Sequence, residues 1–166
     1  GVIALNNAFS TEAQNDASSL VPLMFVVIVL MLAFMLRSAL AAAAVVIIIA
    51  LTIGTTLGLA GWVGVFLSTA TVNVPTIVMT LAVADSVHLI ASSQFLLRQG
   101  LSKPDAIAKA VSLNAMPVLI TSVTTAVGFL TLNFSEVPIL RDLGNMTAVG
   151  VMLAWLFTML LLPALL

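Results

Sequence analysis

The sequence predicts an all-α integral membrane protein with five membrane-spanning helices. Of its 166 residues, 62% are hydrophobic and only 7% are charged, and the mean hydropathy is +1.29. A soluble domain carries about 25% charged residues, so this chain cannot cover its surface with charge. Its apolar residues instead form five segments, each long enough for a helix to cross a hydrocarbon core about 30 Å thick.

The five apolar segments follow one another with short polar breaks. Arg37 ends the first, and glycines and serines soften the end of the second. Pro117 opens the fourth in a first-turn position, where its missing N–H costs nothing, and Pro163 closes the fifth. We therefore expect a transmembrane bundle over residues 20–166, with helices at about 20–36, 39–65, 74–98, 116–134 and 143–162.

Residues 1–19 are the only stretch with the composition of a soluble segment. Val2–Leu5 can be read as the last strand of an upstream domain. Thr11 and Gln14 form a capping box, which predicts that a helix starts at Thr11 and runs into the membrane. The chain begins with Gly1 and has no basic segment followed by a short apolar run, so we expect a piece of a longer protein without its own signal peptide.

Residues 103–114 predict a short interfacial helix before the fourth span. Ile107 and Val111 lie on one side at helical spacing, while Lys103 and Lys109 lie largely elsewhere. An amphipathic helix of this kind lies in the membrane surface. We interpret it as a connector with no function of its own.

The basic residues predict the orientation of the bundle. With the N-terminus outside, Arg37, Arg98, Lys103 and Lys109 fall inside and only Arg141 falls outside. This distribution is the one that the positive-inside rule requires. We expect a multi-pass protein of the cell (inner) membrane, with its N-terminus outside and its C-terminus in the cytoplasm.

The composition also excludes several kinds of site. The net charge of −1 and the lack of a basic patch offer nothing to nucleic acid. The chain has no cysteine and one histidine, so it holds no disulfide, no thiolate chemistry and no Cys- or His-rich metal site. No placed nucleophile or phosphate-binding loop is present. We expect neither an enzyme nor a metal or cofactor.

One ionisable pair lies in the middle of the third span. Asp85 is about 16 Å from the start of that helix at Val74, close to the membrane midplane. A charge there costs at least about 2.5 kcal/mol on insertion scales, and such residues are functional by default. Asp85 and His88 share a helix face. Asp85 is either a neutral structural acid or a group that loads and releases a proton, and His88 either passes the proton on or only accepts or donates a hydrogen bond.

Small and polar residues form stripes on three other helices. Gly54, Gly58 and Gly61 make a smooth ridge, and Gly128 and Gly150 continue the pattern on the fourth and fifth spans. Small residues let helices approach closely in lipid, so we expect all five glycines to serve helix packing. A group of hydroxyls on the fourth span can instead hydrogen-bond the buried acid or a water beside it: Thr121, Thr124 and Thr125.

Four motifs resemble one family. Ala82-Val-Ala-Asp-Ser-Val-His88 resembles the fourth-helix motif G-x-x-x-D-Y-x-x-H of the RND superfamily, in the branch of MMPL-type and hydrophobic-compound exporters. The segment from Pro117 to Phe129 is similar to the fifth-helix signature with its S-x-T-T-x-x-G-F core. Residues 134–144 and 160–165 resemble the turn into the sixth helix and the end of that helix. The resemblance covers the whole chain in order.

The resemblance implies that the five spans are helices two to six of an RND-type six-helix half, with residues 1–19 as the tail of an extracytoplasmic domain. It implies proton-motive-force-driven export of lipids or other hydrophobic compounds, with Asp85 in the proton relay and the proton gradient as energy source. The implied partners are membrane lipids and a second six-helix half, in the same chain or another, and a homo-oligomer is compatible with it. Ser86 stands where the family has tyrosine, so Ser86 or the three threonines would replace that hydroxyl.

A second function remains open. The chain can be a lipid-binding bundle of the related sterol-sensing type, which moves no proton. In that interpretation the ridge of Gly54, Gly58 and Gly61, together with the outside-facing Trp62, lines a groove for the lipid.

Overall fold

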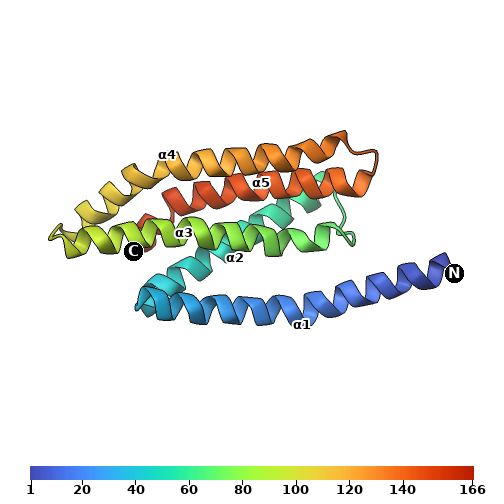
Figure 1. Cartoon of the computed structure of the whole chain (residues 1–166), viewed down its shortest axis with the longest axis horizontal. Coiled ribbons are helices and arrows are strands. Elements are labelled where there is room, and N and C mark those ends of the chain that lie inside the picture. Colours follow the sequence, from blue (N-terminus) through green and yellow to red (C-terminus); the bar gives the residue numbers. More distant parts are fainter.

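The computed structural model describes all residues from 1 to 166 and contains no strand (Figure 1). Five long helices pass back and forth, and all five are long and apolar enough to cross a membrane. Their bounds are α1 Val2–Leu36, α2 Ala39–Val63, α3 Val74–Arg98, α4 Lys103–Leu130 and α5 Pro138–Leu160. Two 3-10 turns, η1 Thr71–Asn73 and η2 Thr131–Phe134, and the short helix α6 Leu162–Leu165 complete the chain. The predicted all-helical membrane fold is therefore confirmed.

Helix α5 lies at the centre of the bundle, where it contacts α2, α3 and α4, whereas α1 lies at the edge and contacts mainly α2 (Figure 1). The main apolar core is built from α2 and α3, with the C-terminal part of α1 and residues of α4, α5 and α6 packed against it. Three side-chain hydrogen bonds tie the long helices to one another: Gln94 Nε2 to the Leu36 carbonyl at 3.0 Å, Asn114 Nδ2 to Ser92 Oγ at 2.8 Å, and Trp155 Nε1 to the Ala115 carbonyl at 3.1 Å.

The N-terminal region differs from the sequence prediction. Helix α1 begins at Val2, so the predicted strand at Val2–Leu5 and the predicted helix start at Thr11 are both wrong. Nothing in residues 2–19 breaks a helix, and the only interruption is Pro22, which removes a single backbone donor. At about 1.5 Å per residue, α1 is roughly 50 Å long, which exceeds the thickness of the hydrocarbon core. The helix is therefore longer than one membrane crossing requires.

The predicted break between an interfacial helix and the fourth span is also absent. Helix α4 runs without interruption from Lys103 to Leu130, with Pro117 inside it and not in a first turn. Prolines are tolerated within membrane helices because neighbouring groups satisfy the freed carbonyls. Residues 103–114 are thus the N-terminal turns of α4, and η2 takes the place of the last predicted turn.

The other predicted boundaries shift by a few residues. Helix α2 ends at Val63 because Gly64 adopts a left-handed conformation with φ 87°, a common helix stop. Helix α5 begins at Pro138, five residues earlier than expected, because proline is well suited to the first turn of a helix.

The glycines divide into two groups. Gly150 lies where α5 crosses α2 and α3, and a methyl group there would meet Val78 Cγ2 at 2.5 Å and Thr56 Oγ1 at 3.1 Å. A methyl group on any of the other four glycines predicted to pack would meet nothing within 4 Å: Gly54, Gly58, Gly61 and Gly128. Of the five glycines predicted to pack, only Gly150 therefore lies at a close helix contact within this chain. A small-residue stripe does not reveal on which side its partner lies.

Candidate functional site

Asp85 occupies the middle of α3 and is turned into the bundle. It is the twelfth of 25 residues in that helix, and its side chain is 8% exposed. The chain has five basic and six acidic residues, and Asp85 is the one that lies midway along a span. Ala82 and Leu89, one helical turn to either side on the same face, are fully buried and apolar. The carboxyl group is therefore held in a nearly dry, apolar environment.

Four of the buried polar side chains lack a hydrogen-bond partner. Asp85 Oδ2, Ser86 Oγ, Thr147 Oγ1 and Thr158 Oγ1 are buried and accept or donate no hydrogen bond within the chain. Buried polar atoms in native proteins are normally paired, so each such group needs an explanation. By contrast, the buried hydroxyls of Thr52 and Thr56 on α2 donate to carbonyls one turn earlier, at 2.7 Å each.

Thr158 lies at the depth of the Asp85–Ser86 pair. Helices α3 and α5 run in the same direction (Figure 1), and Val78 faces Gly150 across their contact. Eight residues further along each helix bring Ser86 and Thr158 to the same level, because both helices rise by about 1.5 Å per residue. Three of the four unpartnered groups thus lie in one layer of the membrane interior.

The side chains of His88 and of the threonines on α4 do not point toward Asp85. His88 is exposed, as are Thr121 and Thr124, and Thr125 is half-buried. The threonine hydroxyls donate to carbonyls of α4 itself, for example Thr125 Oγ1 to the Thr121 carbonyl at 2.7 Å. The hydrogen bond between Asn114 and Ser92 sets the antiparallel register of α3 and α4, which places Thr121 at the depth of Asp85. None of the three threonines hydrogen-bonds Asp85 in this structure.

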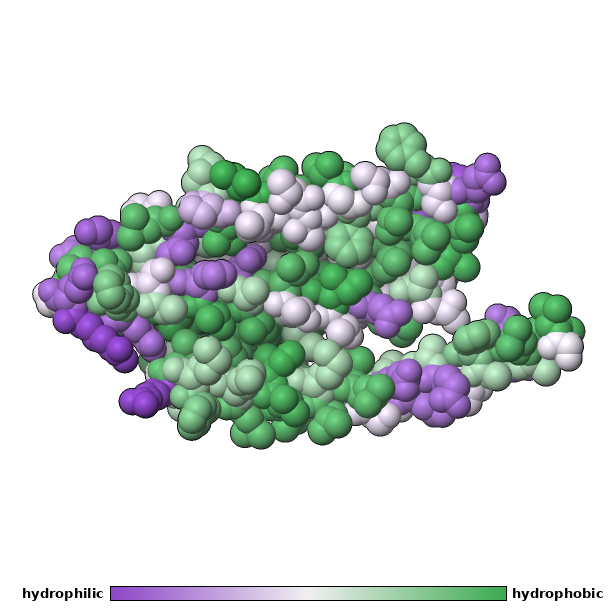
Figure 2. All heavy atoms as spheres, in the orientation of Figure 1, coloured by the Kyte–Doolittle hydropathy of each residue, from purple (hydrophilic) through white to green (hydrophobic).

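The outward surfaces of α3 and α4 are unusually polar for membrane depth. Figure 2 shows pale and purple atoms along both helices, between the green atoms of the apolar residues. The exposed polar residues of these two helices include Thr80 and His88 on α3 and Thr121 and Thr124 on α4. Polar residues in a membrane normally face protein or water.

The sequence pattern does not single out Thr158 among the small and polar residues of the fifth span. The pattern could not show that its hydroxyl is buried without a partner, because that depends on the register of α5 against α3. A threonine whose hydroxyl bonds its own helix and one whose hydroxyl is unpartnered look the same in a sequence.

Replacing Thr158 by valine tests whether its hydroxyl is unpartnered. Valine has nearly the shape of threonine, and removing a buried hydroxyl that makes no hydrogen bond is neutral or stabilising. We expect Thr158→Val to unfold in detergent at the same temperature as the parent chain or a higher one. Thr52→Val is the matched control, since it removes a hydroxyl that donates a hydrogen bond and should lower stability by about 1 kcal/mol. A loss for Thr158→Val as large as for Thr52→Val would contradict the assignment.

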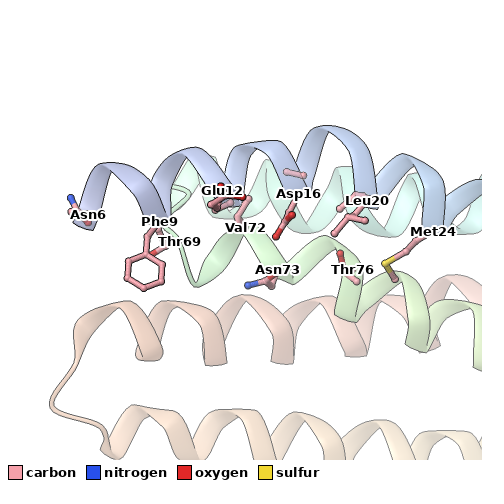
Figure 3. Close-up of a pocket in the computed structure, with 13 residues that line it drawn as sticks. Asn6, Phe9, Glu12, Asp16, Leu20, Met24, Thr69, Val72, Asn73 and Thr76 are labelled. Atoms are coloured by element: carbon pink, nitrogen blue, oxygen red, sulfur yellow. The ribbon is translucent and has the colours of Figure 1, made fainter. Parts of the chain in front are cut away.

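A lateral groove lies between α1 and the start of α3 (Figure 3). Its volume is about 470 Å³, and it opens near the N-terminal end of the bundle. Glu12 and Asp16 from α1 and Asn73 and Thr76 from the other side give it polar groups, and apolar side chains such as Phe9 line the rest. No three acidic or histidine side chains come together to form a metal site anywhere in the chain. The groove suits an amphipathic molecule.

Two comparisons relate the chain to known proteins. The sequence model described as "MMPL family" matches residues 1–166. A curated relative, "Putative membrane protein MJ1562" of Methanocaldococcus jannaschii, is 29% identical over 117 residues, which cover 70% of this chain and 30% of that protein. The matched region thus spans less than a third of the relative's length.

Proposed function

The chain belongs to the MMPL family of the RND superfamily, and we propose that it is the membrane portion of a proton-motive-force-driven exporter of lipids or other hydrophobic compounds. The observation that carries the proposal is Asp85, an acid at the middle of a span with an unpartnered carboxylate oxygen in an apolar environment. Burying a charged group without a partner carries a large cost in free energy. A change in what faces Asp85 would therefore change whether it holds a proton.

In this proposal Asp85 takes up a proton from one side and releases it to the other during the transport cycle. Ser86, adjacent in the chain and fully buried, supplies a hydroxyl where the family motif has tyrosine. His88, Thr121, Thr124 and Thr125 lie on or near the outer polar surface of α3 and α4, where a second six-helix half would cover them. A second half packed against that surface would bring further hydrogen-bond partners to the depth of Asp85.

Transport by the full-length protein in proteoliposomes tests the proposal. A fluorescent phospholipid is followed with and without an imposed pH gradient. We expect movement that requires the gradient and stops when a protonophore collapses it. Movement that is indifferent to both treatments would contradict proton coupling, and no movement under any condition would contradict export of lipids.

The groove between α1 and α3 favours one alternative, lipid binding without proton coupling. It combines polar and apolar lining residues, as a site for an amphipathic lipid would. The glycine ridge proposed from the sequence for this role is exposed on α2 and lies away from this groove. Lipid binding that persists unchanged in Asp85→Asn, without charge movement in the parent protein, would favour this alternative.

We also propose that the N-terminus lies outside the cell membrane and the C-terminus in the cytoplasm. Because the chain has no cysteine, a single introduced thiol reports its side without background. We expect a membrane-impermeant maleimide added to intact cells to label Glu136→Cys in the turn between η2 and α5, and not Gln99→Cys between α3 and α4. Both positions are exposed, so they form a matched pair. The reverse labelling pattern would overturn the orientation.

A further inference from the structure

A second groove lies at the opposite end of the bundle from the lateral groove of Figure 3. Its volume is about 540 Å³, and it is lined by the C-terminal ends of α1 and α3: Met35, Leu36, Arg37, Gln94, Leu97 and Arg98. A smaller cavity of about 120 Å³ shares Gln94 and Leu97 with it and adds Lys103 from the start of α4. Arg37 and Arg98 therefore border the groove, and Lys103 borders the smaller cavity beside it.

The two arginines of this groove are not neutralised within the chain. Both are exposed, and neither has a carboxylate oxygen within 4 Å. The nearest acid along the chain to Lys103 is Asp105, which accepts a hydrogen bond from Ser102 Oγ at 2.8 Å and lines neither cavity. Figure 2 shows hydrophilic atoms gathered at this end, where α1 turns into α2 and α3 turns into α4. The two arginines of the groove thus carry positive charge that no ion pair within the chain balances.

The base of the groove is fixed by packing and by a hydrogen bond. Gln94 Nε2 donates to the carbonyl of Leu36, the last residue of α1, at 3.0 Å. Leu36 is itself 5% exposed, so the end of α1 is anchored to α3. Arg37 follows in a left-handed conformation with φ 48°, which turns the chain away from the axis of α1. The two guanidinium groups therefore project from an anchored framework.

We propose that this groove binds the phosphate headgroup of an anionic phospholipid. Guanidinium groups bind phosphate through paired N–H donors, and two from different helices can hold one headgroup. Met35 and Leu97 line the same groove and offer apolar surface for the start of an acyl chain. The groove lies at the ends of two membrane spans, the level at which lipid headgroups lie, and basic pockets between helices at that level bind such headgroups. The inference depends neither on the orientation of the chain nor on proton coupling.

Lipid titration of the purified full chain in detergent tests the proposal. Native mass spectrometry gives the dissociation constants of phosphatidylglycerol and phosphatidylcholine. We expect the parent chain to favour phosphatidylglycerol, and we expect the double variant R37Q/R98Q to raise the phosphatidylglycerol dissociation constant about 25-fold, at about fivefold per arginine near a headgroup. Phosphatidylcholine binding should change little.

Three controls keep the test decisive. Arg141→Gln removes an exposed arginine at the other end of the bundle and should leave phosphatidylglycerol binding within about twofold. The pair R37K/R98K keeps both charges, and it should retain selectivity even if the glutamine pair proves unstable. Added inorganic phosphate should not displace the lipid at equal concentration. Equal binding of both lipids, an unchanged constant in R37Q/R98Q, or displacement by free phosphate would each overturn the proposal.

Discussion

Asp85→Asn is expected to reduce gradient-driven transport to the level of protein-free vesicles while leaving the fold intact. Asparagine has nearly the shape of aspartic acid but cannot take up and release a proton, so a relay through this position stops. The position is 8% exposed and already holds an unpartnered oxygen, so an amide there disturbs the packing little. The measurement is lipid movement in proteoliposomes under an imposed pH gradient, with protein insertion and thermal stability followed in the same preparations.

Asp142→Asn is the matched control for this substitution. Asp142 is half-buried in the first turns of α5, away from the middle of the membrane, so its neutral variant should transport like the parent protein. Asp85→Glu keeps a titratable group on a longer side chain and should retain part of the activity. Normal gradient-driven transport by Asp85→Asn would remove Asp85 from the relay, and loss of activity accompanied by loss of folded protein would assign it a structural role.

The sequence was sufficient to place Asp85 because hydropathy and helix length alone determine its depth. In an apolar segment of about 25 residues with one acid near its centre, the depth of that acid in the membrane can vary little. The structure puts the acid in the middle of α3. The sequence reveals much less about how each helix is rotated about its own axis, and therefore about which side chains face the bundle. His88 shares a helical face with Asp85 in the sequence pattern, yet it is exposed. Residues three apart differ by about 60° around a helix, which is enough to place one on the buried side and the other on the outward side.

The same limit explains the threonines and the glycines. Apolar residues surround most of each helix, so periodicity does not reveal which stripe faces a neighbour. Thr121 and Thr124 turn outward on α4, while Thr158, which the pattern did not distinguish, is fully buried on α5. Close packing at Gly150 depends on the crossing of α5 with α2 and α3, which only the assembled bundle defines.

Gly144→Ala is expected to destabilise the bundle more than any other single methyl addition considered for this chain. A Cβ atom at this position would clash with the backbone carbonyl oxygen of Phe129 and would lie 3.0 Å from Leu132 Cβ. A backbone group at the end of α4 cannot move aside without shifting the helix or the turn η2, whereas at Gly150 the nearest obstacle is the side chain of Val78. Overpacking a core usually costs about 1 to 3 kcal/mol and occasionally more. The measurement is the fraction of monodisperse protein remaining after stepwise heating in detergent.

Gly58→Ala separates this steric effect from the general effect of replacing glycine in a helix. Gly58 is exposed on α2, and an added methyl group there meets nothing within 4 Å. Alanine restricts the unfolded chain more than glycine does, so this variant should match the parent chain or gain up to about 1 kcal/mol. Equal stability of Gly144→Ala and Gly58→Ala would mean that α4 and α5 do not approach as closely as the structure shows. Destabilisation by Gly58→Ala in the full-length protein alone would instead show that the glycine ridge packs against a part of the protein outside these five helices.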